Sequence, residues 1–254
     1  MPDLRICTYN IHKGFSQFNR RMVIHDLRER LHTLGADIVF LQEVQGMHVQ
    51  HAQRHPDWPA IPQHHFLAEG MWIDSAYGGN AVYDHGHHGN AILSRFPITS
   101  SANQDVSDHR FERRGLLHCE IALPDAPRPL HTVCVHLGLF AGSRRRQMEA
   151  LCERMQVLAG EDAPIIIAGD FNDWRNHADL LLARRLGLQE VFCGGRGRPA
   201  RSFPSALPVF RLDRIYVRGF RIRQAEAHFG GPWARISDHA ALTATLQFGG
   251  DTAR

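Results

Sequence analysis

The sequence of 254 residues predicts an α/β protein. Runs of apolar, often β-branched residues with the length of strands recur from one end of the chain to the other, and Ile165-Ile166-Ile167 is the clearest of them. Between the first two runs, apolar residues at helical spacing indicate an amphipathic helix. No internal repeat, low-complexity segment or linker divides the sequence, so we expect one domain over residues 1–254.

The N-terminal part predicts a strand–helix–strand unit, with strands over 4–9 and 37–41 and a helix over 23–34. A connection of this length favours neighbouring parallel strands. Asn10 follows the first strand and Glu43 follows the second, so we expect these two side chains to lie side by side at one edge of a sheet. The alternative for Glu43 is a structural carboxylate at the start of a helix.

Residues 45–88 show the least regular pattern, with many histidines together with Pro and Gly. We expect this part to be mainly irregular and most of its histidines to lie at the surface. No pair of them has the spacing of metal ligands. His87 or His88 is the candidate for a place near a functional site.

Three strands are expected next, over 89–94, 116–123 and 130–137, and the last two should form an antiparallel hairpin across a Pro-rich turn. Asn90 lies near the start of the first of these strands. His136 lies near the end of the third. A lone histidine in an apolar strand is more often a packed core residue than a catalytic one, so both interpretations stay open for His136.

An apolar stripe over 148–158 predicts a core-facing helix, and residues 165–168 predict a buried strand that ends at Gly169. Asp170 and Asn172 follow at once. Their spacing lets both side chains point into one cleft while the residue between them packs inward. The alternative is an ordinary turn, because Asp and Asn favour turns.

The last third predicts a strand over 211–217 that contains Asp213, and a final strand over 240–248. Burying an unpaired carboxylate costs free energy, so Asp213 needs a partner. Asp238 and His239 immediately precede the final strand. If the two strands lie close together, the imidazole of His239 is the natural partner for the carboxylate.

The composition is that of an ordinary globular protein, with 43% hydrophobic and 22% charged residues and no run long enough to span a membrane. Asp3 and Arg5 interrupt the first apolar stretch, which predicts no signal peptide, and five scattered cysteines predict free thiols. We therefore expect a cytoplasmic monomer. Basic clusters at 144–146 and at Arg196, Arg198 and Arg201 either attract an anionic substrate or form solvated faces.

Polar groups at strand ends suggest the chemistry of the site. They are Asn10, Glu43, His136, Asp170, Asn172, Asp213, Asp238 and His239. Carboxylates and amides without cysteines select Mg²⁺, with Mn²⁺ as a substitute, over zinc. Such an ion neutralises phosphoryl oxygens, and an imidazole oriented by an acid suits proton transfer. The pattern therefore predicts metal-assisted hydrolysis of a phosphoester.

Six short motifs in order resemble the endonuclease/exonuclease/phosphatase (DNase I-like) superfamily, and in detail an uncharacterised bacterial subfamily of it. They begin at residues 8, 41, 135, 169, 212 and 237 and read TYN, LQEV, VHL, GDFN, LDRI and SDH. The resemblance spans residues 4–247. It implies a four-layer α/β sandwich, in which two mixed β-sheets pack face to face with helices outside. It also implies that Glu43 is the principal metal ligand, with Asn10 and Asp238 near the same ion.

The resemblance also implies roles in catalysis. His239 and Asp213 would form a hydrogen-bonded pair beside the scissile phosphate. Asp170 would orient or deprotonate the attacking water, Asn172 would bind a phosphoryl oxygen, and His136 would donate to the phosphate or assist the leaving group. Both His239 and Asp170 are candidates for the base.

Substrate contacts are expected from Asn90, which would brace His136 in this arrangement, and from Arg114. A nuclease-like phosphodiesterase is the favoured function, with nucleic acid as a candidate partner. One alternative is a phospholipid-headgroup phosphodiesterase or phosphatase in peripheral contact with a membrane, for which Met71-Trp72-Ile73 offers a candidate patch. The other is a catalytically silent nucleic-acid-binding protein on the same fold.

Overall fold

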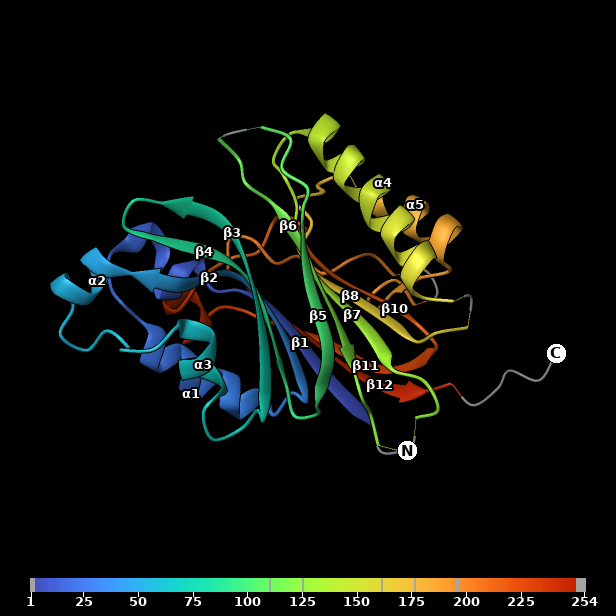
Figure 1. Ribbon diagram of the computed structural model, residues 1–254, viewed down its shortest axis with the longest axis horizontal. Coiled ribbons are helices and arrows are strands. Elements are labelled where there is room, and N and C mark those ends of the chain that lie inside the picture. Colours follow the sequence, from blue (N-terminus) through green and yellow to red (C-terminus); the bar gives the residue numbers. More distant parts are fainter. Residues whose placement is uncertain are drawn as a thin grey trace.

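A computed structural model describes residues 3–109, 111–124, 126–160, 162–175, 177–194 and 197–249 of the protein. Two six-stranded mixed sheets pack face to face, and helices cover their outer faces (Figure 1). The four-layer α/β sandwich implied by the resemblance is therefore confirmed. Arg196, part of the second basic cluster, lies outside the described residues.

The first sheet has the strand order β11-β12-β1-β2-β4-β3. Its strands are β1 (Leu4–Asn10), β2 (Ile38–His48), β3 (Asp74–Tyr83), β4 (Gly86–Ser94), β11 (Phe220–His228) and β12 (Ala241–Phe248). β1 and β2 are parallel, as predicted from the crossover between them, and every other neighbouring pair is antiparallel. Gly35 ends the connecting helix with a φ of 62°, a left-handed conformation that glycine adopts without a Cβ clash.

The second sheet has the order β5-β6-β7-β8-β10-β9. Its strands are β5 (Ile98–Asp105), β6 (Gly115–Ile121), β7 (Leu130–His136), β8 (Ile165–Asp170), β9 (Gln189–Glu190) and β10 (Asp213–Arg218). The α-helices are α1 (Ile24–Leu34), α2 (Val49–Arg54), α3 (Gln63–Ala68), α4 (Ala141–Leu158) and α5 (His177–Leu186), and short 3₁₀ turns cover His12–Gly14, Gln17–Asn19 and Trp233–Arg235. β7 and β8 are parallel and α4 connects them.

Three apolar layers hold the sandwich together. Between the sheets, Phe40 and Ile92 of the first sheet share a buried cluster with Leu117 and Ile166 of the second. A second cluster packs α1 on the outer face of the first sheet, and a third packs α4 and α5 on the second. The apolar stripe over 148–158 faces this third layer, as its helical spacing predicted.

Several elements differ from the expected ones. β2 continues to His48 instead of ending at Leu41, and residues 45–88 contain α2, α3 and most of a hairpin instead of loop. β3, β5, β9 and β11 were not predicted. β5 exposes most of its side chains, so it lacks the apolar alternation that marks a half-buried strand.

The topology brings the ends of many strands to one edge of the sandwich. β1, β2, β7 and β8 end there, and β10 and β12 begin there because they run antiparallel to β8 and β1. The β3–β4 turn, the segment between β5 and β6 and the end of β11 share the same edge. We call this side of the molecule the strand-end edge.

Candidate active site

The polar side chains singled out in the sequence meet at the strand-end edge. β8 lies between β7 and β10, and its register places His136 and Asp213 on either side of Asp170. From the other sheet, Asn10 Nδ2 donates to Asp170 Oδ2 at 3.3 Å. Side chains from both sheets therefore form one continuous cluster.

Asp170 lies at the centre of this cluster. Its Oδ2 is 3.5 Å from His136 Nε2 and 3.8 Å from His239 Nε2, and its Oδ1 accepts the backbone N–H of Asn172 at 2.9 Å. Burial raises the pKa of Asp170 above its ordinary value, and the negative charge of Asp213 raises it further. A carboxyl group with a raised pKa is suited to exchange protons near neutral pH.

His239 and Asp213 form a buried pair, in which His239 Nδ1 lies 2.8 Å from Asp213 Oδ2. Burial disfavours the imidazolium, but the Asp213 carboxylate outweighs this effect and raises the pKa of His239 above its ordinary value. Ser237 fixes the local backbone, because its Oγ accepts from His239 N at 3.2 Å and donates to the carbonyl of Asn10 at 2.7 Å. The ring is thereby held with Nε2 toward Asp170.

Glu43 reaches the cluster through an irregularity in β2. The pairing of β2 with β4 shifts register between Leu41 and Val44, and Glu43 has a φ of 58°. Its Oε1 accepts from Asn10 Nδ2 at 3.4 Å, and its Oε2 lies 3.5 Å from Lys13 Nζ. Burial opposes ionisation, but the cationic forms of neighbouring basic groups outweigh it and lower the pKa of Glu43 to about 2. The carboxylate is therefore ionised at neutral pH.

The donors expected to hold a metal fit a hard divalent cation. Glu43 and Asp238 keep side-chain exposures of 20% and 18%, and Asn10 adds an amide from the end of β1, the strand between β2 and β12 in the sheet. Asp238 Oδ1 lies 3.4 Å from His12 Nδ1, so each acid has a basic neighbour in the turn after β1. An all-oxygen set of this kind suits Mg²⁺ or Mn²⁺.

A second set of possible ligand atoms comes from Asp170, Asp213 and His239, whose ligand atoms lie within 4.8 Å of one another. The hydrogen bond between the last two occupies His239 Nδ1, and the raised pKa favours a protonated ring. A protonated imidazole cannot bind a metal. The set with Glu43 is therefore the better candidate.

Asn172 adopts a left-handed conformation with a φ of 48° immediately after β8. Its Nδ2 donates to the carbonyl of Leu137 at 3.0 Å and its side chain is buried. Phe171 points the other way and packs edge-on against Tyr216, at 5.1 Å between ring centroids. The amide therefore ties the end of β8 to the loop after β7, and its second N–H remains for a ligand.

Replacing Asn172 by Asp should lower both turnover and the melting temperature. A carboxylate at this position would face the Leu137 carbonyl without a donor, and a buried unsatisfied polar group costs about 1–3 kcal/mol. We expect a melting temperature lower by roughly 2–12 °C for a chain of this size. Calorimetry checks the first effect and steady-state kinetics at saturating Mg²⁺ checks the second. An unchanged melting temperature would contradict the bracing role of the amide.

His136 is buried, and burial lowers its pKa well below the ordinary value, with Arg114 adding to the effect. Arg114 donates from Nε to the Leu137 carbonyl at 3.2 Å and pairs with Glu112 at 3.2 Å, so its guanidinium is held near the end of β7. Asn90 does not contact the His136 side chain in any hydrogen bond of the described residues. It donates to the carbonyls of Gly115 and Cys134, and thus braces the strand that carries His136.

Sequence reasoning missed several contributors. His12 and Lys13, both with positive φ, place basic groups against the acids of the site, and the motif Asn10–Gly14 was the available signal. Phe203 packs on the His239 ring at 5.0 Å, from a loop with no chemical signature. His88, a candidate from the sequence, is half-buried near the site, and this partial burial lowers its pKa to about 4.

The basic cluster at 144–146 is engaged within the protein. Arg144 donates to the carbonyl of Gly138 at 3.1 Å, Arg145 pairs with Glu149 at 3.6 Å, and Arg146 pairs with Asp108. These contacts favour the structural interpretation of the cluster over capture of an anionic substrate.

The sequence and the fold match a known class of proteins. The model of the Endonuclease/Exonuclease/phosphatase family matches residues 7–239, and the chain belongs to this family. The chain is similar to the uncharacterized protein YbhP of Escherichia coli strain K12, with 46% identity over 252 residues that cover 97% of this chain and 99% of the relative.

Solved structures show the same fold at low sequence identity. An endonuclease/exonuclease/phosphatase from Beutenbergia cavernae superposes with a TM-score of 0.76 at 17% identity, covering 100% of this chain and 74% of that one. The human Nocturnin catalytic domain with bound sulfate superposes with a TM-score of 0.74 at 19% identity, covering 98% of this chain and 95% of that one. At these sequence identities, the structural similarity shows a shared fold only.

Proposed function

We propose that this chain is a metal-dependent phosphoester hydrolase, with Mg²⁺ as cofactor and Mn²⁺ as a substitute, built on a single domain over residues 1–254. The main observation in support of this function is that Asp170 contacts Asn10, His136 and His239 at once. This arrangement connects the oxygen donors of one sheet to the hydrogen-bonded pair of His239, just before β12, and Asp213, at the start of β10. Membership of the family supports the same reaction class.

The cation would be held by Glu43, with Asn10 and Asp238 beside it. When bound, it supplies positive charge that neutralises the phosphoryl oxygens and lowers the pKa of a bound water. The low pKa of Glu43 keeps the principal ligand ionised over the physiological range. Lys13, which pairs with Glu43, would have to yield its place to the cation.

Proton transfer is assigned to Asp170 and His239 acting together, because their facing atoms are 3.8 Å apart. The proton of the attacking water passes to this pair as its oxygen bonds to phosphorus. One P–O ester bond then breaks, and the leaving oxygen takes up a proton. Asp213 acts as a positioning residue, since it holds Nδ1 of the ring and leaves Nε2 free for the transfer.

In this proposal the phosphate is bound by two neutral donors, His136 and Asn172, and by one arginine. His136 is uncharged at neutral pH because its pKa lies well below the ordinary value, so it offers an N–H hydrogen bond without titrating. Asn172 offers its second amide N–H, and Arg114 lies at the rim with the only permanent positive charge among these three groups. Donors of this kind stabilise charge that develops in the transition state.

A first test is dependence on a divalent cation. Hydrolysis of bis-p-nitrophenyl phosphate should vanish in EDTA and return with Mg²⁺ or Mn²⁺. Glu43→Gln should weaken metal binding in calorimetric titration and lower turnover without a large change in melting temperature. Glu149→Gln, an acid exposed on α4 and paired with Arg145, is the matched control and should behave as the wild type. Full turnover by protein stripped of metal would refute the proposal.

The alternative, a catalytically silent protein on the same fold, predicts no hydrolysis of bis-p-nitrophenyl phosphate in the same assay. It requires that some group of the cluster be displaced or inert. Asp170, His136 and the His239–Asp213 pair instead lie within 4 Å of one another in a chain of contacts. This geometry favours the enzyme.

A further inference from the structure

Large apolar side chains are exposed unevenly over the surface. Among the described residues, eighteen such side chains are exposed, and thirteen of them lie in segments at the strand-end edge. The other five are Ile61, Ile73, Val157, Leu158 and Leu180. The exposed apolar residues are thus concentrated on the side of the molecule that carries the proposed active site.

Both sheets contribute to this concentration. From the first sheet come Phe18 in the segment after β1, Val82 beside the β3–β4 turn, and Phe229 directly after β11. Val82 is 78% exposed and Phe18 is 71% exposed. Each lies at the strand-end edge because of the strand directions described above.

The second sheet contributes further exposed apolar residues at the same edge. Phe111 lies between β5 and β6, Phe140 precedes α4, and Leu207 lies in the segment before β10. Leu207 is 75% exposed. We call the exposed apolar residues of these segments, with those of the first sheet, the apolar rim. Exposed apolar side chains that gather on one side of a protein are typical of a surface that meets another protein, a ligand or a membrane.

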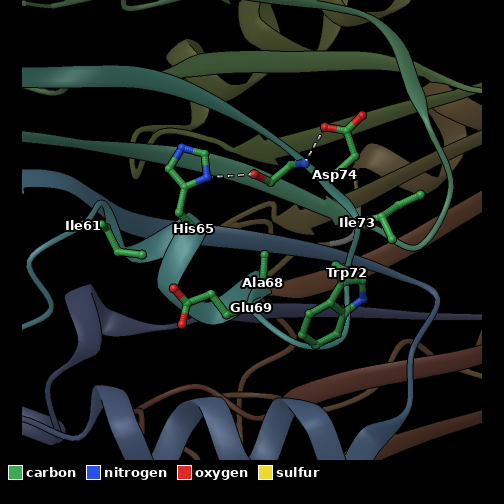
Figure 2. Close-up of a pocket in the computed structure, with 8 residues that line it drawn as sticks. Ile61, His65, Ala68, Glu69, Trp72, Ile73 and Asp74 are labelled. Atoms are coloured by element: carbon green, nitrogen blue, oxygen red, sulfur yellow. Dashed lines mark hydrogen bonds between the residues drawn. The ribbon is translucent and has the colours of Figure 1, made fainter.

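The segment suggested by the sequence as an apolar patch does not belong to the rim. Trp72 is buried and its Nε1 donates to the carbonyl of Ala36 at 3.0 Å, so only Ile73 is widely exposed. Figure 2 shows the hollow of about 310 Å³ beside these residues, between α3 and the start of β3. The start of β3 lies at the edge opposite the strand-end edge, where Asp74 pairs with Ser94.

The chemistry of the rim distinguishes between partners. Several of its members are aliphatic, as Val82 and Leu207 are, and aliphatic side chains do not form the stacks with bases that aromatic rings provide. The aromatic member Phe18 stands beside an exposed arginine, with the Arg20 guanidinium 5.3 Å from the Phe18 ring. An exposed apolar side chain with an arginine beside it matches the boundary between acyl chains and anionic headgroups.

The net charge of +3 agrees with this choice of partner. A protein committed to nucleic acid usually carries a strongly basic stripe. The arginines at 144–146, in contrast, are occupied by internal contacts. No helix among the described residues has the length and apolar character to cross a bilayer.

We propose that the apolar rim docks on a phospholipid bilayer containing anionic lipid, and that the phosphoester hydrolysed is the headgroup phosphate of a phospholipid. This inference rests on the proposed function and adds its substrate class, replacing the nuclease favoured from the sequence. The reaction balances as a hydrolysis. A water oxygen bonds to phosphorus, one P–O ester bond of the lipid breaks, and the released oxygen takes up the proton, with no change of oxidation state.

The test compares exposed aliphatic side chains on two sides of the molecule. Val82→Asp together with Leu207→Asp removes two members of the rim. Val157→Asp alters a side chain that is 85% exposed at the far end of α4, away from the strand-end edge. Each protein is sedimented with vesicles of phosphatidylcholine and phosphatidylglycerol, and assayed both on the vesicle lipid and on bis-p-nitrophenyl phosphate.

The wild type and Val157→Asp should sediment with the vesicles and release lipid products. The rim variant should lose vesicle binding and lipid hydrolysis by at least about tenfold, because two apolar side chains no longer enter the bilayer. Its turnover of the soluble substrate should be unchanged.

Three outcomes would overturn the inference: wild-type protein that stays in the supernatant, equal losses in the rim and Val157→Asp variants, or sedimentation competed away by single-stranded DNA. The proposed function fails separately, if no protein hydrolyses the soluble substrate with Mg²⁺ present.

Discussion

His239→Ala and Asp213→Ala should each lower turnover on the order of 10²–10⁴-fold, the usual contribution of a positioned proton-transfer group. His239→Ala would remove the imidazole ring that exchanges the proton. Asp213→Ala would leave the ring in place but without the acceptor that lies 2.8 Å from its Nδ1. Turnover of bis-p-nitrophenyl phosphate at saturating Mg²⁺ measures both losses.

The double variant provides the sharper result. Because the two residues act as one unit in the proposed mechanism, the double variant should lose little more than either single variant. Losses that multiply would show that the two side chains act independently. His228→Ala is a matched control, since this histidine bonds Thr243 Oγ1 at 2.8 Å in the same sheet and has no proposed role. Melting temperatures of all four variants identify any loss that comes from unfolding.

The sequence predicted the parts of the site that depend on local chemistry. Apolar strands that end in polar residues placed Asp170, His136 and Asn10 at strand ends, and the structure has them there. Apolar runs were enough to predict these strands, and apolar residues at helical spacing were enough to predict α1 and α4. The family resemblance supplied what periodicity could not, namely that the strand ends of two separate sheets face one another.

Other features depend on contacts distant in sequence. Glu43 was expected after a strand, but it lies within β2 at a register shift with positive φ, and no local pattern marks such a shift. Asp213 was expected inside a strand, whereas it is the first residue of β10 and is therefore placed at the edge. The apolar rim was also beyond local reasoning, because exposure of Val82 or Leu207 is decided by tertiary packing.

Asp170→Asn should lower turnover by a similar factor, on the order of 10²–10⁴-fold, although the substitution keeps the size of the side chain. The amide oxygen can still accept the Asn172 N–H, so the turn after β8 should persist. What is lost is the negative charge shared by His136, His239 and Asn10. Kinetics at saturating Mg²⁺ measures the loss, and the melting temperature shows that the chain remains folded.

A second measurement separates the charge of Asp170 from a merely structural role. The carboxylates of Asp213 and Asp170 both raise the pKa of His239, and Asp213 has the larger effect. Removing either charge favours the neutral ring, so the pKa of His239 should fall in Asp170→Asn and fall further in Asp213→Asn. NMR titration of the imidazole in metal-free protein gives both values. An unchanged pKa of His239 in Asp170→Asn, with turnover intact, would remove Asp170 from the proton-transfer pair and leave His239 as the only base.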